Sequence, residues 1–338
     1  MTNKSRPNSI LTDTFGREHT YLRISLTERC NLRCTYCMPK DGIQLSPKSE
    51  IMTYEEIFQI AKTFVDNGVT KIRLTGGEPL IRKDAALIIE QLASLGVELA
   101  ITTNGVIVDQ FIDLFKKCGI TKINLSLDSL KEDKNTQITR RNYFERVYNN
   151  LLVLLDEGFE VKLNCVLIKG FNDDEIIDFI ELTKEHSLSL RFIEFMPFDG
   201  NQWKLNKLVS LEEIITKANE HYQKDQVIRL TDAPNDTSKN YRIKNFKGSF
   251  AVISSVSNPF CDSCNRIRLT ANGRLKNCLF SSSESDLLTT LRAGTSIDSI
   301  IEKTVKSKQK IRAGMNTMEE FNNTDTHKNN RSMVAIGG

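Results

Sequence analysis

Six short β-prone runs alternate with segments of helical length between residues 21 and 195 of this 338-residue chain. The runs are 21–27, 71–75, 97–103, 122–127, 160–167 and 190–195. The motif Thr53-x-x-Glu56 is a capping box, which predicts where the first intervening helix begins. Strands that alternate with helices form a parallel sheet through right-handed crossovers. The pattern therefore predicts an α/β fold, either an open doubly wound sheet or a partial barrel.

The character of the side chains alternates along these runs. One parity is apolar, and the other carries polar and cationic residues, among them Arg23, Lys71, Arg73, Lys162 and Arg191. A conventional barrel has a branched apolar interior, and a doubly wound sheet is apolar on both faces. The pattern thus favours an incomplete (β/α)6 barrel, similar to a TIM barrel, with a polar inner face. Because isolated buried cations are costly, its ligand should be polyanionic, unless several of these cations extend from strand starts into solvent.

Three cysteines with the spacing C-x3-C-x2-C follow the first run, at Cys30, Cys34 and Cys37. Structural zinc takes four protein ligands and an ordinary 4Fe–4S cluster takes four thiolates, so three thiolates leave one metal position open. With an aromatic residue before the third cysteine, this spacing is typical of radical S-adenosylmethionine (SAM) enzymes, whose open iron holds SAM. Zinc binding or unrelated thiols are the alternative.

The segment Thr75-Gly76-Gly77-Glu78-Pro79 follows the second run. Glycines after a strand let the backbone approach a ligand closely, and a neighbouring glutamate can accept hydrogen bonds from an ammonium group. Beside the cysteines, this segment resembles the loop that cradles the methionine amino group in radical SAM enzymes. Ser126 and Met196 end later runs, at the edge where barrels place active-site groups.

Composition narrows the function classes. Lys and Arg number 46 against 43 Asp and Glu, and a net charge of +3 indicates neither a nucleic-acid-binding nor a membrane-binding protein. No apolar run reaches the length of a membrane span, and the polar start lacks the core of a signal peptide. We therefore expect a cytoplasmic enzyme. Six of its eight cysteines lie in two groups, which favours metal ligands over disulfides in that compartment.

The alternation stops near residue 196. We expect an N-terminal arm (1–20), the partial barrel (21–196), a C-terminal α+β module with a second iron–sulfur cluster (197–315) and a mobile tail ending in Gly-Gly (316–338). The capping box Ser210-x-x-Glu213 predicts a helix in the module, and Asn272-Gly273 predicts a hairpin turn.

The module carries a second set of three cysteines, Cys261, Cys264 and Cys278. Zinc with one further ligand from elsewhere in the chain is one interpretation. We favour a second 4Fe–4S cluster with an open iron, because the first set already commits the protein to iron–sulfur assembly. Arg266 and Arg268 stand beside this set, and arginine suits the bidentate recognition of phosphate.

Over nearly its whole length the chain resembles the GTP 3′,8-cyclase family, also called molybdenum cofactor biosynthesis protein A. The resemblance rests on residues 15–17, 22–30, 37–39, 73–80, 191–196, 264–269 and 336–338. It implies that one cluster is held by Cys30, Cys34 and Cys37, and the other by Cys261, Cys264 and Cys278. The implied SAM contacts are Tyr36, Gly77, Ser126 and Met196. The implied GTP contacts are Arg23, Lys71, Arg73, Thr102, Lys162, Arg191, Arg266 and Arg268. No catalytic residue is assigned beyond the cluster ligands.

The resemblance also implies the chemistry of a lyase. Reductive cleavage of SAM would give a 5′-deoxyadenosyl radical that takes hydrogen from ribose C3′ of GTP, and C3′ would then attack C8 of a guanine held on the second cluster. The product would be (8S)-3′,8-cyclo-7,8-dihydroguanosine 5′-triphosphate, in the first step of molybdenum cofactor (molybdopterin) biosynthesis.

The partners implied by the resemblance are a reductase or an electron donor of the flavodoxin or ferredoxin type, and a downstream cyclic pyranopterin monophosphate synthase. A homodimer is also implied, as is an activating role for the Gly337-Gly338 end of the tail.

Two other interpretations compete. A two-cluster radical SAM enzyme that modifies a peptide would also have clustered cysteines in its second module, but a peptide needs a groove rather than a set of inward cations. A non-catalytic iron–sulfur or zinc regulatory protein would bind metal without cleaving SAM. That interpretation leaves the glycine–glutamate segment after the second run unexplained.

Overall fold

A single twelve-stranded sheet forms the centre of the computed structural model, which describes residues 9–327 and 330–337. The first six strands lie side by side in sequence order, and each is parallel to its neighbours. They are β1 (Tyr21–Ser25), β2 (Lys71–Thr75), β3 (Glu98–Thr103), β4 (Lys122–Ser126), β5 (Glu160–Leu167) and β6 (Ser189–Glu194). The predicted α/β fold with a parallel sheet is confirmed.

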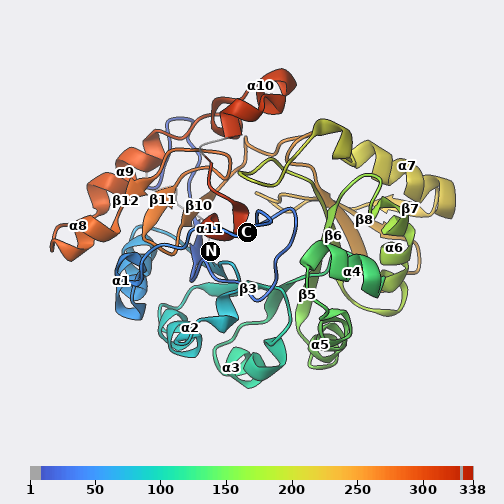
Figure 1. Ribbon diagram of the computed structural model, residues 1–338, viewed down its shortest axis with the longest axis horizontal. Coiled ribbons are helices and arrows are strands. Elements are labelled where there is room, and N and C mark those ends of the chain that lie inside the picture. The colour runs from blue at the N-terminus through green and yellow to red at the C-terminus, as the bar shows by residue number, and fades with distance from the viewer. Residues whose placement is uncertain (1–8, 328–329, 338) are drawn as a thin grey trace.

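The helices between these strands lie along the outer side of the sheet (Figure 1). They are α1 (Tyr54–Asp66), α2 (Ala85–Ala93), α3 (Ile112–Lys117), α4 (Glu132–Thr139), α5 (Phe144–Asp156) and α6 (Ile176–Glu185). The predicted capping box opens α1: the Thr53 side chain accepts from Glu56 N, and the Glu56 carboxylate accepts from Thr53 N at 2.7 Å. These two bonds provide acceptors for backbone N–H groups that have no hydrogen-bond partner within the first turn of a helix.

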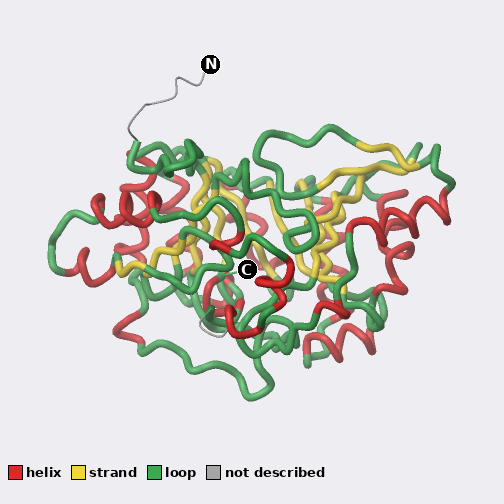
Figure 2. Tube along the Cα trace, turned by 90° about the horizontal axis from the view of Figure 1, so that it is seen from above, coloured by secondary structure: helices red, strands yellow, loops and turns green. Residues whose placement is uncertain are grey.

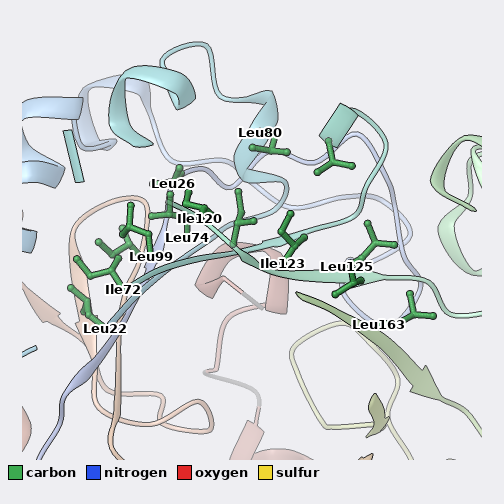
Figure 3. Close-up of a cluster of buried hydrophobic side chains, with 14 of the residues drawn as sticks. Leu22, Leu26, Ile72, Leu74, Leu80, Leu99, Ile120, Ile123, Leu125 and Leu163 are labelled. Atoms are coloured by element: carbon green, nitrogen blue, oxygen red, sulfur yellow. The ribbon is translucent and has the colours of Figure 1, made fainter. Parts of the chain in front are cut away.

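The apolar parity of the strands faces these helices. Leu22, Ile72, Ile123 and Leu163 are fully or almost fully buried in one continuous core (Figure 3). Burying each such side chain contributes about 1.5–3 kcal/mol. The burial fixes the register of the strands, because a slip by one residue would turn the polar parity toward the helices. The polar parity is therefore held on the inner side.

The part of the chain expected as an appended module extends the same sheet at both edges. Strand β9 (Ser249–Ile253) pairs in parallel with β6, and β10 (Arg266–Leu269) pairs in parallel with β1. Antiparallel strands complete each edge: β8 (Lys239–Ile243) and β7 (Val227–Arg229) beyond β9, and β11 (Arg274–Lys276) and β12 (Ser285–Asp286) beyond β10. The predicted hairpin turn is confirmed, with Gly273 at a φ of 69° between β10 and β11.

Three further helices belong to this part of the chain: α7 (Leu211–Tyr222), α8 (Leu288–Arg292) and α9 (Asp298–Lys306). The capping box predicted at Ser210 opens α7, with both of its hydrogen bonds present. Within residues 9–327 and 330–337, no helix has the length and apolar character needed to cross a membrane.

The described parts of the N-terminal arm and of the C-terminal tail both pack against the rest of the protein. In the arm, Arg17 is buried and donates to the carbonyl oxygens of Cys261 (2.8 Å) and Lys310 (2.9 Å). The segment expected as a mobile tail contains α10 (Met318–Asn322) and α11 (Met333–Ile336), and Figure 2 shows its end near the middle of the molecule. It buries Phe321 and Ile336 in a second apolar cluster with Trp203 and Phe280. The mobility of the tail stays a prediction, and Gly338 lies outside the described residues.

Candidate active site

A cavity of about 570 Å³ lies against the inner, polar side of the sheet, within the usual range for small-molecule sites of about 300–1,000 Å³. Both cysteine sets line it, and so does every residue predicted to contact SAM or GTP. These are Cys30, Cys34, Cys37, Cys261, Cys264 and Cys278, then Tyr36, Gly77, Ser126 and Met196, and then Arg23, Lys71, Arg73, Thr102, Lys162, Arg191, Arg266 and Arg268. The structure thus brings the predicted residues together around one cavity, while their individual roles stay predictions.

The first cysteine set lies in the loop after β1. The loop folds back on itself through Cys37 N to Cys34 O (3.0 Å), and two backbone bonds attach it to the end of α4: Arg33 N to Thr139 O and Thr35 N to Ile138 O, both 2.9 Å. Burial raises the pKa of the Cys30 thiol to about 11 and raises the pKa values of Cys34 and Cys37 as well. A cluster binds its cysteines as thiolates, so binding would release these protons, and the three thiols of this one loop would supply the sulfur ligands.

The glycine segment after β2 lies directly against this loop. Gly77 N donates to Thr27 O and Glu78 N donates to Arg29 O, both at 2.8 Å. A Cβ atom on Gly77 would stand 2.3 Å from the Arg29 carbonyl oxygen, which no side chain could accommodate without moving backbone. Only glycine permits this contact, and it places the segment beside Cys30.

Glu78 differs from the expectation that it could accept from a ligand ammonium group. Its side chain is fully buried and already accepts from Leu80 N (3.1 Å), Thr103 Oγ1 (2.9 Å) and Asn104 N (2.7 Å). Burial raises the pKa of Glu78 to about 7 against these hydrogen bonds. The carboxylate therefore ties the end of β2 to the end of β3, and the backbone of the glycines faces the cavity instead.

The residues predicted to contact SAM lie at the carboxyl ends of strands, near the first cysteine set. Ser126 ends β4, Met196 follows β6, and Tyr36 stands within the cysteine loop. The Tyr36 hydroxyl donates to Asp128 Oδ2 at 2.7 Å, and burial raises the pKa of Asp128 to about 6. This bond connects the cysteine loop with the end of β4, which sequence reasoning did not predict.

The predicted GTP contacts form a cationic wall. Register pairs Arg23 on β1 with Arg73 on β2 and with Arg268 on β10, so three guanidinium groups come from neighbouring strands. Burial, together with nearby Arg191, Arg73 and Lys71, lowers the pKa of Lys162 to about 8. Burial also lowers the pKa values of Arg23 and Arg191 to about 10. Cations that lower the pKa values of one another in this way are stabilised in their charged form when a polyanion binds between them.

Two residues of this wall were missed by sequence reasoning. Tyr21 accepts from Arg73 Nε, and its ring lies 5.3 Å from Lys71 Nζ; the cations outweigh the effect of burial and lower its pKa to about 7. Asp236 comes from the loop between β7 and β8 and raises the pKa values of Lys162 and Arg191 in opposition to burial. Tyr21 lies two residues before Arg23 and therefore on the same side of β1, so the alternation along this strand could have predicted that it faces the cavity. Asp236 lies in a loop, and no local sequence pattern predicts its position.

The second cysteine set lies next to cations. Lys308 Nζ donates to Cys264 Sγ at 3.3 Å, and although burial raises the pKa of Cys264, Arg266 and Lys308 lower it to about 6. A thiolate is therefore favoured at Cys264, whereas burial raises the pKa of Cys261. No three His, Cys, Asp or Glu side chains in residues 9–327 and 330–337 are arranged to hold a single metal ion. The cluster proposal consequently rests on residue types, their setting and the family.

The end of the chain reaches the same region. Arg268 Nη1 donates to Gly337 O at 2.6 Å, and Met333 lines the cavity. Gly337 has a φ of 78°, and a Cβ atom there would lie 2.5 Å from Thr75 Oγ1. The tail thus contacts β2 and β10 at a point where only glycine fits without displacement.

Two successive segments of the chain match two known protein families. Residues 24–183 match the Radical SAM superfamily, and residues 188–314 match the family described as Molybdenum Cofactor Synthesis C. Among solved structures, SuiB of Streptococcus suis bound to S-adenosylmethionine has a TM-score of 0.56 at 17% identity, over 80% of this chain and 65% of that one. This likeness supports the fold alone.

Relatives of higher identity extend over most of the sequence. The mitochondrial GTP 3′,8-cyclase of Arabidopsis thaliana is 46% identical, over 99% of this chain and 85% of that protein. The GTP 3′,8-cyclase of Listeria monocytogenes is 40% identical, over 88% and 91%. Molybdenum cofactor biosynthesis protein 1 of Dictyostelium discoideum is 45% identical over 97% of this chain, which spans only 52% of that longer relative. The chain therefore belongs to the GTP 3′,8-cyclase family within the radical SAM superfamily.

Proposed function

We propose that this protein is a radical SAM lyase that rearranges GTP to (8S)-3′,8-cyclo-7,8-dihydroguanosine 5′-triphosphate, the first step of molybdenum cofactor biosynthesis. The observation that carries the proposal is one cavity lined by two three-cysteine sets and by cations from β1, β2, β5, β6 and β10. A redox or zinc protein without a substrate has no use for such a cationic wall. The names of the relatives in Arabidopsis and Listeria support the same reaction.

The first cysteine set would hold a 4Fe–4S cluster that leaves one iron for SAM. When bound, the cluster and SAM supply a 5′-deoxyadenosyl radical that can take a hydrogen atom. Gly77 would let the backbone approach the methionine part of SAM, and Tyr36, Ser126 and Met196 would surround the rest of the molecule. The bond from Tyr36 to Asp128 would keep the cysteine loop fixed against β4.

The cationic wall would orient GTP. Lys71, Arg73, Lys162 and Arg191 would bind triphosphate oxygens, because charge-assisted hydrogen bonds to phosphate are strong and arginine can form them in pairs. The second cysteine set would hold a second 4Fe–4S cluster facing the guanine, with Arg266 and Arg268 beside it. If GTP is bound at both its triphosphate and its guanine, the ribose between them has little freedom to move. Holding the reacting atoms in a fixed orientation lowers the barrier of the reaction.

The tail would complete the cavity. A Gly337→Ala variant is expected to lose most of its turnover while keeping both clusters, because a Cβ atom would collide with Thr75 Oγ1 and the bond from Arg268 to the tail would be lost. Turnover and iron content together test this expectation. Gly294→Ala is the matched control, since Gly294 also has a positive φ but has open space around it. Equal losses in the two variants would contradict the role of the tail.

The test of the function is anaerobic. The protein is reconstituted with iron and sulfide, supplied with reductant, SAM and GTP, and followed by chromatography with mass detection for 5′-deoxyadenosine and an isomer of GTP. We expect the isomer to appear only when GTP, SAM and reductant are all present. Formation of 5′-deoxyadenosine without change in GTP would retain the radical SAM assignment and overturn the substrate. Absence of both from a fully loaded, reduced preparation would overturn the enzyme.

Further proposals follow from the family. The open, curved sheet supports a partial barrel as its description. The partners would be an external electron donor of the reductase, flavodoxin or ferredoxin kind, a cyclic pyranopterin monophosphate synthase that takes the product, and a second copy of the chain in a homodimer. Cytoplasmic location stays a prediction, and the Arabidopsis relative is named as mitochondrial.

A further inference from the structure

The outer side of the first cysteine loop carries exposed positive charge. Residues 28–41 and 138–142 lie side by side, joined by the backbone bonds from Arg33 and Thr35 to the end of α4. Arg140 Nη1 adds bonds to Arg33 O at 3.3 Å and to Met38 O at 3.5 Å. Together the two segments present five cations, which we call the basic surface: Arg29, Arg33, Lys40, Arg140 and Arg141.

The basic surface contains little exposed negative charge of its own, and Glu132 lies beside it, where it accepts from Asn142 Nδ2 at 3.0 Å. The same two segments contain two carboxylates, Glu28 and Asp41. Glu28 is 4% exposed and accepts hydrogen bonds from Ser46, so Asp41 is the one exposed acid in these segments. Among the described residues, no ion pair involves any of the five cations. By contrast, Lys131 and Lys134 around the start of α4 both pair with Asp174.

The basic surface is also the part of the exterior nearest to the first cysteine set along the chain. Arg33 stands between Cys30 and Cys34, and its guanidinium lies against Met38 Sδ at 2.8 Å, just after Cys37. A donor on this surface would therefore lie beside the loop that holds the cysteines.

We propose that the basic surface docks a small acidic protein that carries a low-potential, one-electron group. The proposal rests on the proposed function, because the reductive cleavage of SAM needs one electron from outside the protein. The donor is oxidised by one electron, and that electron breaks the bond between the SAM sulfur and C5′, giving methionine and the 5′-deoxyadenosyl radical. Complementary charge would steer the donor to the loop and raise the rate of encounter, in a manner that salt screens.

The test compares two electron sources with one protein. Lys40→Glu/Arg141→Glu changes two exposed cations whose side chains form no bond to the cysteines. Lys224→Glu/Lys244→Glu is the matched control, with two exposed lysines flanking the sheet-edge strands β7 and β8. Each is assayed with flavodoxin kept reduced by its NADPH-dependent reductase, and separately with dithionite. Binding of the flavodoxin is measured directly at low and high salt.

We expect the Lys40/Arg141 variant to lose roughly tenfold or more of the flavodoxin-driven rate and affinity, because two attractions become repulsions. Its dithionite-driven rate should equal that of the wild type. High salt should weaken flavodoxin binding to the wild type and have little effect on the variant. The control should behave as the wild type in every assay.

Other results would contradict the docking proposal, reassign the surface or contradict the proposed function. Unchanged flavodoxin binding and rate in the Lys40/Arg141 variant would overturn the docking proposal, as would an equal loss in the control variant. Equal loss with both reductants would show that these residues support the site and do not dock a donor. Preferential binding of a nucleic acid, and not the flavodoxin, would assign the surface to that partner. A wild type inactive with dithionite would overturn the proposed function, while the binding measurement would still decide the docking.

Discussion

A Cys278→Ala variant is expected to lose the cyclisation of GTP completely while it still binds SAM. Cys278 lines the cavity together with Cys261 and Cys264, and Cys278 and Cys264 add to the effect of burial in raising the pKa of Cys261. Removing one of three thiolates leaves two, which is too few to hold a cluster that already lacks a fourth protein ligand. The iron content of the reconstituted protein should therefore fall by about half, and the guanine would lose its proposed position.

The measurements are iron and sulfide content, SAM binding by equilibrium dialysis, and product formation. Cys118→Ala is the matched control, because Cys118 is a half-buried free cysteine at the end of α3, away from the cavity wall. It should retain its iron and its turnover. Full turnover in Cys278→Ala would make the second cysteine set a structural feature only. Full iron content with lost turnover would mean that another residue replaces Cys278 as a ligand.

The core of the fold was predictable because its signals are local. Two capping boxes identify the starts of α1 and α7, and both are present with their hydrogen bonds. The strands β2 and β5 begin and end at the predicted residues, since β-prone runs there are bounded by turns. Parity of side chains predicted which residues face the cavity, as Arg23 and Lys162 illustrate. These features depend on neighbours within a few positions.

The arrangement of residues beyond 196 was not predictable in the same way. Tyr21 pairs with Arg266, which is far away in the sequence, and no periodicity in either segment specifies that partner. The pairing of β9 with β6 is likewise not specified by any local pattern in the two strands. In the tail, Phe321 packs edge-on against Trp203 at 5.9 Å between ring centres, a contact that the polar composition around Phe321 does not indicate. Long-range contacts of this kind depend on the assembled surface and not on local pattern.

In the candidate site, sequence identified charged groups more readily than their partners. Tyr21 looked like an ordinary strand residue, and its role as an acceptor for Arg73 appears only when β1 and β2 are in register. Glu78 looked available to a ligand, but Leu80 N after β2, Thr103 Oγ1 on β3 and Asn104 N just after β3 donate to its carboxylate. Hydrogen-bond satisfaction is decided by three-dimensional neighbours, which is why both roles were missed.

A Lys162→Ala variant is expected to bind GTP roughly 10- to 100-fold more weakly, since a hydrogen bond to a charged group contributes about 1.5–3 kcal/mol. Its pH dependence should be diagnostic. Burial and neighbouring cations lower the pKa of Lys162 to about 8 in the free protein, and a bound triphosphate would raise it again. Above pH 8 the wild type must take up a proton to bind GTP, so its affinity should fall by up to about tenfold per pH unit.

The alanine variant lacks this proton, so its GTP affinity should be nearly constant from pH 8 to pH 9. Lys122→Ala is the matched control: Lys122 begins the adjacent strand β4, pairs with Glu98 at 3.1 Å and is absent from the cavity wall. It should bind GTP as the wild type does, with the same dependence on pH. Unchanged affinity in Lys162→Ala would contradict the cationic wall as the triphosphate site. A decline with pH that persists in this variant would assign the proton to another group, and Tyr21, whose pKa is lowered to about 7, is the candidate.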